Sequence, residues 1–357
     1  CGFGVGGLTI PFDLLAEFMP AERRGEFLMK MEYFWTGGSM FVTGLAWMVL
    51  NSEGWRVLTY ATAIPVIVAS IFSISLLPES PRWLMEKGHV AEAEKVLLEA
   101  AEVNGTPYQG GLSLLPLDRA SSKKDVSDVD SASGRPTNAS ESAAPSTFQM
   151  YKELLQPENV GYSYQLWIMW FCFGLTYYGI ILFVSRIYSD STSDADPTCS
   201  FKYEYIFGNA CSELPGIFLC LLVIDPWGRP KTLVVTYALS AFGVLLLGLT
   251  TEATAALVVG LIGRAAIVAA NSSTWVATPE LYKTDFRGTG HASCNAATRV
   301  GGFCAPYIVD SPLTFASVGV ILFSFNMLAG FTSMLLPDMQ GLDIDSDIDF
   351  KSSSMQS

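Results

Sequence analysis

The feature that most constrains this chain is a series of nine apolar blocks, each near the length that crosses a lipid bilayer as a helix, about 20 residues. They occupy residues 1–18, 32–50, 57–77, 165–184, 203–224, 232–250, 255–278, 289–309 and 315–336. Only 15% of the 357 residues are charged, whereas a soluble domain carries about 25%. Nine blocks in one chain disfavour the alternative of buried core helices in a soluble protein. The sequence therefore predicts an all-α polytopic membrane protein.

Charge and motif content exclude several classes of function. The net charge of −13 disfavours nucleic acid as a partner, because nucleic-acid binding needs a basic face. The seven Cys and two His residues match no metal-ligand spacing. The sequence contains no Walker loop, no HExxH pair and no nucleophile motif. We therefore expect neither an enzyme nor an ATP-driven pump, and neither a metal nor a cofactor.

The basic residues predict how the spans are oriented. If the block 1–18 ends in the cytoplasm, 16 of the 21 Lys and Arg residues fall on the cytoplasmic side, three fall opposite and two lie inside spans. An excess of Lys and Arg is typical of cytoplasmic loops. We therefore expect the long loop and the C-terminus to be cytoplasmic, in a multi-pass protein of the plasma membrane or of an intracellular vesicle membrane.

The blocks divide the chain into four parts. Residues 1–77 hold three spans, 78–163 form a central loop, 164–336 hold six spans and 337–357 form an acidic tail. Within the loop, apolar residues at helical spacing predict an amphipathic helix over 81–103. The stretch 118–147 is rich in Ser, Asp, Ala and Pro, so it is predicted to be disordered, as is the tail.

An internal repeat links the two groups of spans. Glu17, Arg24 and Gly25 close the first block with a Glu-x6-Arg-Gly pattern, and this pattern recurs at Glu280 and Arg287 after the seventh block. Copies six spans apart predict two homologous six-span halves. A carboxylate at a membrane boundary is costly alone, so we expect each Glu to pair with the Arg of its own repeat. Nine spans, and a first residue that is Cys rather than Met, then predict that several spans are missing before residue 1.

These motifs resemble the major facilitator superfamily, within its sugar porters and organic ion transporters. The family pattern after its sixth helix matches Pro78-Glu79-Ser80-Pro81-Arg82-Trp83-Leu84, and its D-x-x-G-R loop matches Asp225, Gly228, Arg229 and Lys231, with Pro230 between the two basic residues. The resemblance implies the major facilitator fold, with helices four to twelve of twelve present. The segments Glu213-Leu214-Pro215-Gly216 and Arg299-Val300-Gly301-Gly302 are similar to the synaptic-vesicle-two-related and nicotinate-type transporters.

The resemblance assigns roles to charges at two depths. At the cytoplasmic rim it implies ion pairs that hold the halves together and break on inward opening, among Glu17, Arg24, Glu79, Arg82, Asp225, Arg229, Glu280 and Arg287. The alternative is that these residues only anchor the fold.

Deeper in the membrane, Glu213, Arg264 and Arg299 lie near the middle of their spans, and such residues are candidates for function. We expect Glu213 to pair with one of the two arginines and to serve substrate or proton coupling, the alternative being a structural ion pair. Asp13 is either a second proton site or a partner in the rim network. Candidates for lining a cavity are Trp35, Tyr177, Tyr178, Asn209, Asn271, Ser272 and Trp275.

Together these features predict transport of a small organic solute across a membrane by alternating access, with the proton as a candidate coupling ion. An organic anion or cation fits, an aromatic acid among them, and a sugar fits less well. Two intramembrane Arg residues against one Glu favour an anion. The alternative is a transport-inactive vesicle-membrane protein that acts as a binding or receptor component. The expected partners are the lipid bilayer, the solute and protons.

Overall fold

The computed structural model describes residues 7–50, 52–106, 147–157, 159–190, 203–250, 252–284 and 286–339. These residues form helices and turns, and no strand occurs among them. The chain splits into two compact units, Cys1–Leu77 with Glu153–Ser357 and, separately, Pro78–Lys152; each is described by itself. The segment predicted to be disordered, apart from its last residue, and the tail beyond Met339 lie outside the described residues, as does the beginning of the first block.

The second unit contains α5 (Pro81–Glu86) and α6 (Val90–Val103), which pack on each other. The Ser80 hydroxyl caps α5 by accepting a backbone N–H of its first turn at 3.2 Å, as a helix N-cap should. The single helix predicted over 81–103 is wrong, because the chain is broken at Gly88. The φ of +81° at this glycine is a left-handed conformation that ends a helix. A further helix, α7 (Thr147–Leu154), crosses the boundary between the units.

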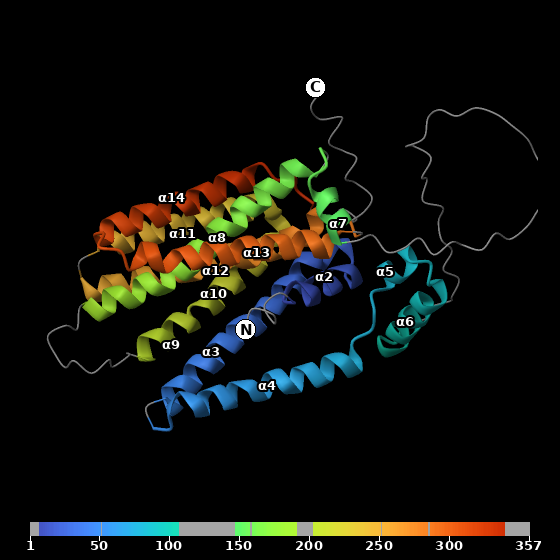
Figure 1. Cartoon of the computed structure of the whole chain (residues 1–357), viewed down its shortest axis with the longest axis horizontal. Helices are drawn as coiled ribbons and strands as arrows, with labels where there is room; N and C mark the ends of the chain where they lie inside the picture. Colours follow the sequence, from blue (N-terminus) through green and yellow to red (C-terminus); the bar gives the residue numbers. More distant parts are fainter. Residues whose placement is uncertain are drawn as a thin grey trace, which may run out of the picture. The chain divides into compact units, whose positions relative to one another are not determined.

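The N-terminal part of the first unit contains α2 (Thr9–Phe18), the short 3-10 turn η1 (Ala21–Arg23), α3 (Arg24–Val49) and α4 (Gly54–Leu76). Met19 ends α2 in an extended conformation because the residue before a proline is pushed out of the helical region. Helices α2 and α3 pack on each other, and α4 packs on α3 (Figure 1). None of the residues of α4 is buried.

The C-terminal part contains α8 (Val160–Asp190), α9 (Tyr203–Cys211), α10 (Glu213–Trp227), α11 (Arg229–Leu249), α12 (Ala253–Leu281), α13 (Arg287–Val309) and α14 (Phe315–Met334). Each apolar block from 165 onward coincides with one of these helices, except 203–224, which is interrupted at Ser212. The prediction of an all-α protein is confirmed. Among the described residues, six helical stretches are long and apolar enough to cross a membrane; α3 and α13 are long enough but less apolar.

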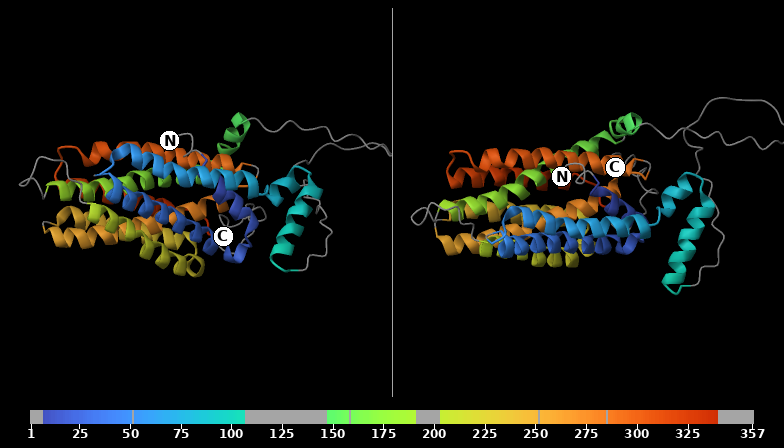
Figure 2. Two further views of the ribbon diagram at one scale, coloured as in Figure 1. Left: turned by 90° about the horizontal axis from the view of Figure 1, so that it is seen from below. Right: turned by 60° about the horizontal axis from the view of Figure 1, so that its bottom comes forward.

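The helices of the first unit run side by side, with their long axes close to parallel (Figure 2). In the C-terminal part, α8 packs against α12, α13 and α14, and α11 packs against α12 and α14. The N-terminal helices contact this bundle through five helix pairs, because α2 lies on α12 and α13 and α3 lies on α9, α10 and α12. Any side chain at these contacts therefore belongs to the junction between the two parts.

Glycines allow the tightest of the helix contacts, between α8 and α13. A Cβ at Gly174 would lie 2.2 Å from the carbonyl oxygen of Thr298, and a Cβ at Gly301 would lie 2.1 Å from that of Phe171. Any larger residue would force the two helices apart. Small residues at close helix crossings are typical of membrane bundles, where packing rather than water exclusion drives association.

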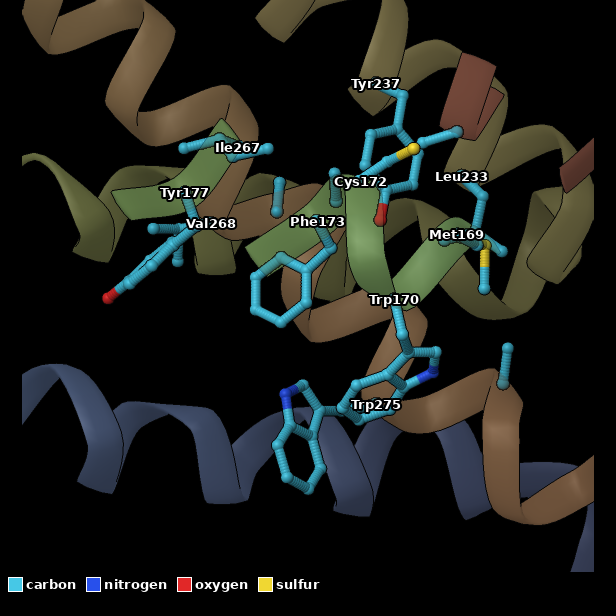
Figure 3. Close-up of a cluster of buried hydrophobic side chains, with 14 of the residues drawn as sticks. Met169, Trp170, Cys172, Phe173, Tyr177, Leu233, Tyr237, Ile267, Val268 and Trp275 are labelled. Atoms are coloured by element: carbon cyan, nitrogen blue, oxygen red, sulfur yellow. The ribbon is translucent and has the colours of Figure 1, made fainter. Parts of the chain in front are cut away.

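Aromatic and aliphatic side chains of α8, α11 and α12 fill the centre of the bundle (Figure 3). Trp170 and Trp275 meet edge to face with ring centroids 4.8 Å apart, a favourable geometry for aromatic pairs. Two polar groups of this core are satisfied within it: the Trp170 indole donates to the Thr278 hydroxyl at 2.9 Å, and the Tyr237 hydroxyl lies 2.9 Å from that of Thr274. The outer faces of the helices are apolar instead, as Phe303 illustrates with an exposed fraction of 67%.

Candidate functional site

A buried ion pair lies where α3, α8, α10 and α12 meet. The Arg264 guanidinium donates to Glu213 and, at 3.0 Å, to the Tyr177 hydroxyl. The second carboxylate oxygen of Glu213 accepts from the Thr36 hydroxyl at 2.9 Å. Trp35 donates its indole N–H to the Tyr177 hydroxyl at 3.2 Å. Since Trp35 and Thr36 belong to α3 and the others to the C-terminal helices, this network joins the two parts of the unit.

The interruption of the fifth apolar block positions Glu213. Pro215 has no N–H to donate to the carbonyl of Cys211, so the hydrogen-bond ladder is broken here and a new helix begins at Glu213. The carboxylate thus lies in the first turn of α10, where free N–H groups and the helix dipole favour a negative charge. Together α9 and α10 still form one apolar stretch long enough to span a membrane, Ile206–Trp227, and Glu213 lies within it. Broken helices of this kind surround binding sites in membrane transporters.

A second buried carboxylate, Glu32 of α3, lies one helical turn before Thr36 and was not recognised from the sequence. Ser272 of α12 donates to it at 3.1 Å, and Glu32 is only 4% exposed. Among the described residues no Lys or Arg forms an ion pair with Glu32. The negative charge of Glu213 is close enough to repel an ionised Glu32. Its position at the first residue of the block 32–50 made it look like a boundary residue, whereas α3 extends back to Arg24.

Arg299, the other arginine expected near Glu213, lies elsewhere. It donates to the Tyr178 hydroxyl and to the Asn295 side-chain oxygen, both at 3.0 Å, and its Nε is buried without a hydrogen-bond partner. The central cluster of Glu32, Glu213 and Arg264 therefore carries two carboxylates against one guanidinium. Of the remaining candidates for lining a cavity, Asn209, Asn271, Ser272 and Trp275 are buried between helices.

The rim residues pair across the repeats. Arg287 donates to Glu17 at 2.7 Å, and Arg24 lies 3.9 Å from Glu280. Arg229 binds both oxygens of Glu280, at 2.8 and 2.9 Å. The expectation that each Glu pairs within its own repeat is thus corrected, since each carboxylate contacts the arginine of the other repeat. Arg24, Arg229, Glu280 and Arg287 are all buried, so these pairs are shielded from water.

The D-x-x-G-R loop is built into the same rim. Asp225 accepts from Arg229 at 3.0 Å and from the backbone N–H of Glu26 at 3.1 Å. A Cβ at Gly25 would lie 2.3 Å from the Asp225 carboxylate, which explains why glycine follows the arginine of the first repeat. Gly228 has a φ of +81°, so the turn requires glycine here.

Two of the predicted rim residues, Glu79 and Arg82, belong to the second unit, which is described by itself. Their participation in the rim network stays a prediction.

A second cross-helix pair lies one turn from the Glu17–Arg287 pair. Asp13 precedes Glu17 by four residues on α2, and His291 follows Arg287 by four residues on α13. The Asp13 carboxylate lies 2.7 Å from Nδ1 of His291. Sequence reasoning missed His291, because a lone histidine in an apolar helix belongs to no motif. The matching spacing of four on both helices was the signal that could have found it.

Among the described residues, no group of three or more His, Cys, Asp or Glu side chains could hold a metal ion. The chemistry available is thus that of buried carboxylates, guanidinium groups, one imidazole and the aromatic rings beside them.

The chain resembles known proteins in both sequence and structure. Residues 1–346 match the family described as "Sugar (and other) transporter". The chain is 28% identical over 322 residues to the "Putative transporter svop-1" of Caenorhabditis elegans, covering 87% of this chain and 57% of that protein. It is 28% identical over 355 residues to the "Synaptic vesicle 2-related protein" of Xenopus laevis, covering 94% and 60%. It therefore spans about three fifths of the length of these two relatives.

A plant relative and a solved structure extend the comparison. The "Organic cation/carnitine transporter 7" of Arabidopsis thaliana is 26% identical over 366 residues, covering 96% of this chain and 72% of the relative. The structure of the proton:xylose symporter XylE, a major facilitator superfamily protein, superposes with a TM-score of 0.62 at 17% identity, covering 95% of this chain and 70% of XylE. This likeness concerns the fold alone.

Proposed function

Because the chain belongs to the sugar (and other) transporter family of the major facilitator superfamily, we propose that it serves the transport of a small organic cation by alternating access. The protein is an integral, multi-pass membrane protein, and we place it in the plasma membrane or an intracellular vesicle membrane. The observation that carries the proposal is the central cluster of Glu32, Glu213 and Arg264, in which two buried carboxyl groups accompany one guanidinium.

The charge of this cluster favours a cation over an anion. Uncompensated charge inside a membrane protein is costly, so a bound cation stabilises Glu32 and an anion does not. The indole of Trp35 lies in the same network, and aromatic faces attract organic cations; the Tyr177 ring already has the Arg264 guanidinium 4.3 Å from its centroid. One relative is named for organic cation transport. The argument for an anion from two intramembrane arginines is weaker, since Arg299 bonds to other residues than Glu213.

The two carboxylates have different tasks in this proposal. Arg264 and Thr36 hold Glu213 ionised and in place. Glu32, with one hydroxyl as its side-chain partner, takes up either the cation or a proton. Protons and the cation therefore compete for one carboxylate, which couples their movements in opposite directions.

The rim pairs act as the gate. Glu17–Arg287 and Arg24–Glu280 join helices of the two parts, so they hold the cytoplasmic rim closed while the cation site faces the other side. Opening toward the cytoplasm separates both pairs as the two parts rock about the central site.

Equilibrium binding tests the cation site directly. Radiolabelled tetraethylammonium is titrated into the detergent-solubilised protein, and Glu32→Gln should weaken its binding by about tenfold or more, equivalent to about 1.4 kcal/mol. Glu26→Gln on the same helix is the matched control and should bind normally. Its carboxylate is at the rim, where hydrogen bonds from Lys30 and Arg23 hold its pKa below the ordinary value.

A second ligand and a flux measurement discriminate the alternatives. Nicotinate binding that is lost in Arg299→Gln, together with no tetraethylammonium binding, would replace the cation site by an anion site. Tetraethylammonium binding without uptake into proteoliposomes would favour the receptor-like alternative.

A further inference from the structure

The Asp13–His291 pair is buried at the junction of α2 and α13, apart from the central cluster. Nδ1 of His291 lies 2.7 Å from Oδ1 of Asp13. The histidine is fully buried, and Asp13 is 9% exposed. The outward atoms of both groups, Nε2 of His291 and Oδ2 of Asp13, are buried without a hydrogen-bond partner. Each group thus has one satisfied atom and one free atom.

Two indole rings border the imidazole. The ring centroid of Trp275 lies 5.0 Å from that of His291, and that of Trp170 lies 5.4 Å away, both close to edge-on. Figure 3 shows Trp170 and Trp275 on the side of the core nearest the N-terminal helices, and Phe12 of α2 packs on Trp275 with a centroid distance of 5.2 Å. The pair is therefore enclosed by aromatic rings.

The charged and titratable groups around the pair are few. On α2, Glu17 lies one turn away and is paired with Arg287, itself one turn from His291 on α13. Also on α13, the Cys294 thiol lies within electrostatic reach of Asp13. Helices α8 and α12 place Trp170 and Trp275 against the imidazole. The neighbouring Glu17–Arg287 pair is neutral as a whole, so it leaves the charge of the Asp13–His291 pair uncompensated.

The hydrogen bond fixes the chemistry of the pair. A neutral imidazole that donates Nδ1–H to an ionised carboxylate leaves the Nε2 lone pair free to accept a proton. In that state the pair carries one negative charge. Proton uptake at Nε2 produces an imidazolium beside a carboxylate and reduces the net charge to zero, which an apolar environment favours.

We propose that Asp13 and His291 form a proton-binding site between the N-terminal and C-terminal helices, separate from the Glu32–Glu213–Arg264 cluster. The site binds its proton while α2 and α13 are in contact. Separation of these helices removes the carboxylate from the imidazolium, so the proton is released. The site therefore holds a proton only while the rim is closed.

The two tryptophans provide a built-in readout, because a protonated imidazole in contact with an indole quenches its fluorescence. Tryptophan emission of the purified chain is followed from about pH 5 to 8, the range in which histidine titrates. Emission should fall on acidification in a single transition that is lost in His291→Gln. It should persist in His89→Gln, the matched control at the one other histidine of the sequence. Asp13→Asn should change the transition, because the imidazolium has lost its counter-charge.

A second measurement leaves the site intact. The variant His89→Gln keeps His291 as the sole histidine, and its imidazole ¹⁵N resonances report tautomer and protonation directly. Resonances that move from the Nδ1–H tautomer to the imidazolium as the pH falls would support the site. An imidazole that does not change over this range, or a fluorescence transition that survives in His291→Gln, would overturn it. Neither readout involves solute or flux, so the outcome is independent of whether the protein transports a cation.

Discussion

Replacement of Arg287 by alanine tests the cross-repeat rim most directly. Its guanidinium donates to Glu17 at 2.7 Å, to the Pro279 carbonyl at 2.9 Å and to the Thr284 hydroxyl at 2.9 Å, and the residue is 1% exposed. Removal of one partner from a buried ion pair costs about 3–5 kcal/mol. We therefore expect Arg287→Ala to destabilise the protein by about 3 kcal/mol, the lower end of this range, because a partly buried carboxylate and a buried carbonyl both lose this donor.

A double-mutant cycle with Glu17→Gln isolates the pair. Chemical unfolding in mild detergent gives the free energy of the wild type, both single variants and the double variant. Residues in contact show interaction energies of about 0.5–3 kcal/mol, so the double variant should be more stable than the sum of the single changes predicts. Arg23→Ala is the control, since its side chain is 62% exposed in its pair with Glu26, and it should leave stability unchanged. Additive effects at Glu17 and Arg287 would refute the cross-repeat pairing.

The same substitution should open the rim. Cys294, fully buried on α13, should react faster with a membrane-permeant maleimide in Arg287→Ala than in the wild type. An unchanged rate would mean that the pair braces the fold without gating.

Three further outcomes are expected. Gly301→Ala should destabilise the bundle by about 1–3 kcal/mol in detergent unfolding, because its Cβ would lie 2.1 Å from a carbonyl oxygen of α8, whereas Gly161→Ala in open space on α8 should not. Gly25→Ala should increase maleimide labelling at the rim, because its Cβ would lie 2.3 Å from a carboxylate, whereas Gly37→Ala, with no atom within 4 Å, should not. Tetraethylammonium binding should weaken as the pH falls, and Glu32→Gln should remove this dependence; an equal pH profile in both proteins would contradict proton competition at this carboxylate.

The sequence predicted the helices well because the membrane imposes their length and composition. The apolar blocks within the described residues coincide with helices, apart from the interruption of 203–224 at Ser212, and the errors occur where backbone chemistry acts locally. Gly88 divides the amphipathic segment through its positive φ, and Pro215 removes a donor from the block 203–224. Neither effect changes hydropathy, so a pattern of apolar residues does not contain it.

The candidate site was predicted less completely, since its contacts join residues far apart in the chain. The motifs identified the rim arginines and carboxylates. Their partners depend on how the repeats pack, and each carboxylate contacts the arginine of the other repeat. Glu32 and His291 belong to no motif. Each is recognised only from its surroundings. Among the described residues Glu32 has a hydroxyl but no Lys or Arg as its partner, and His291 lies beside two indole rings.

The crossed rim pairs have the reciprocity of a twofold-symmetric dimer, in which residue i of one subunit contacts j of the other and j contacts i. Glu17 contacts Arg287 while Arg24 approaches Glu280, so the two repeats are related as the subunits of such a dimer, joined in one chain. A charge reversal at Glu17 should therefore be compensated by a reversal at Arg287, 270 residues along the chain, rather than at the arginine of its own repeat.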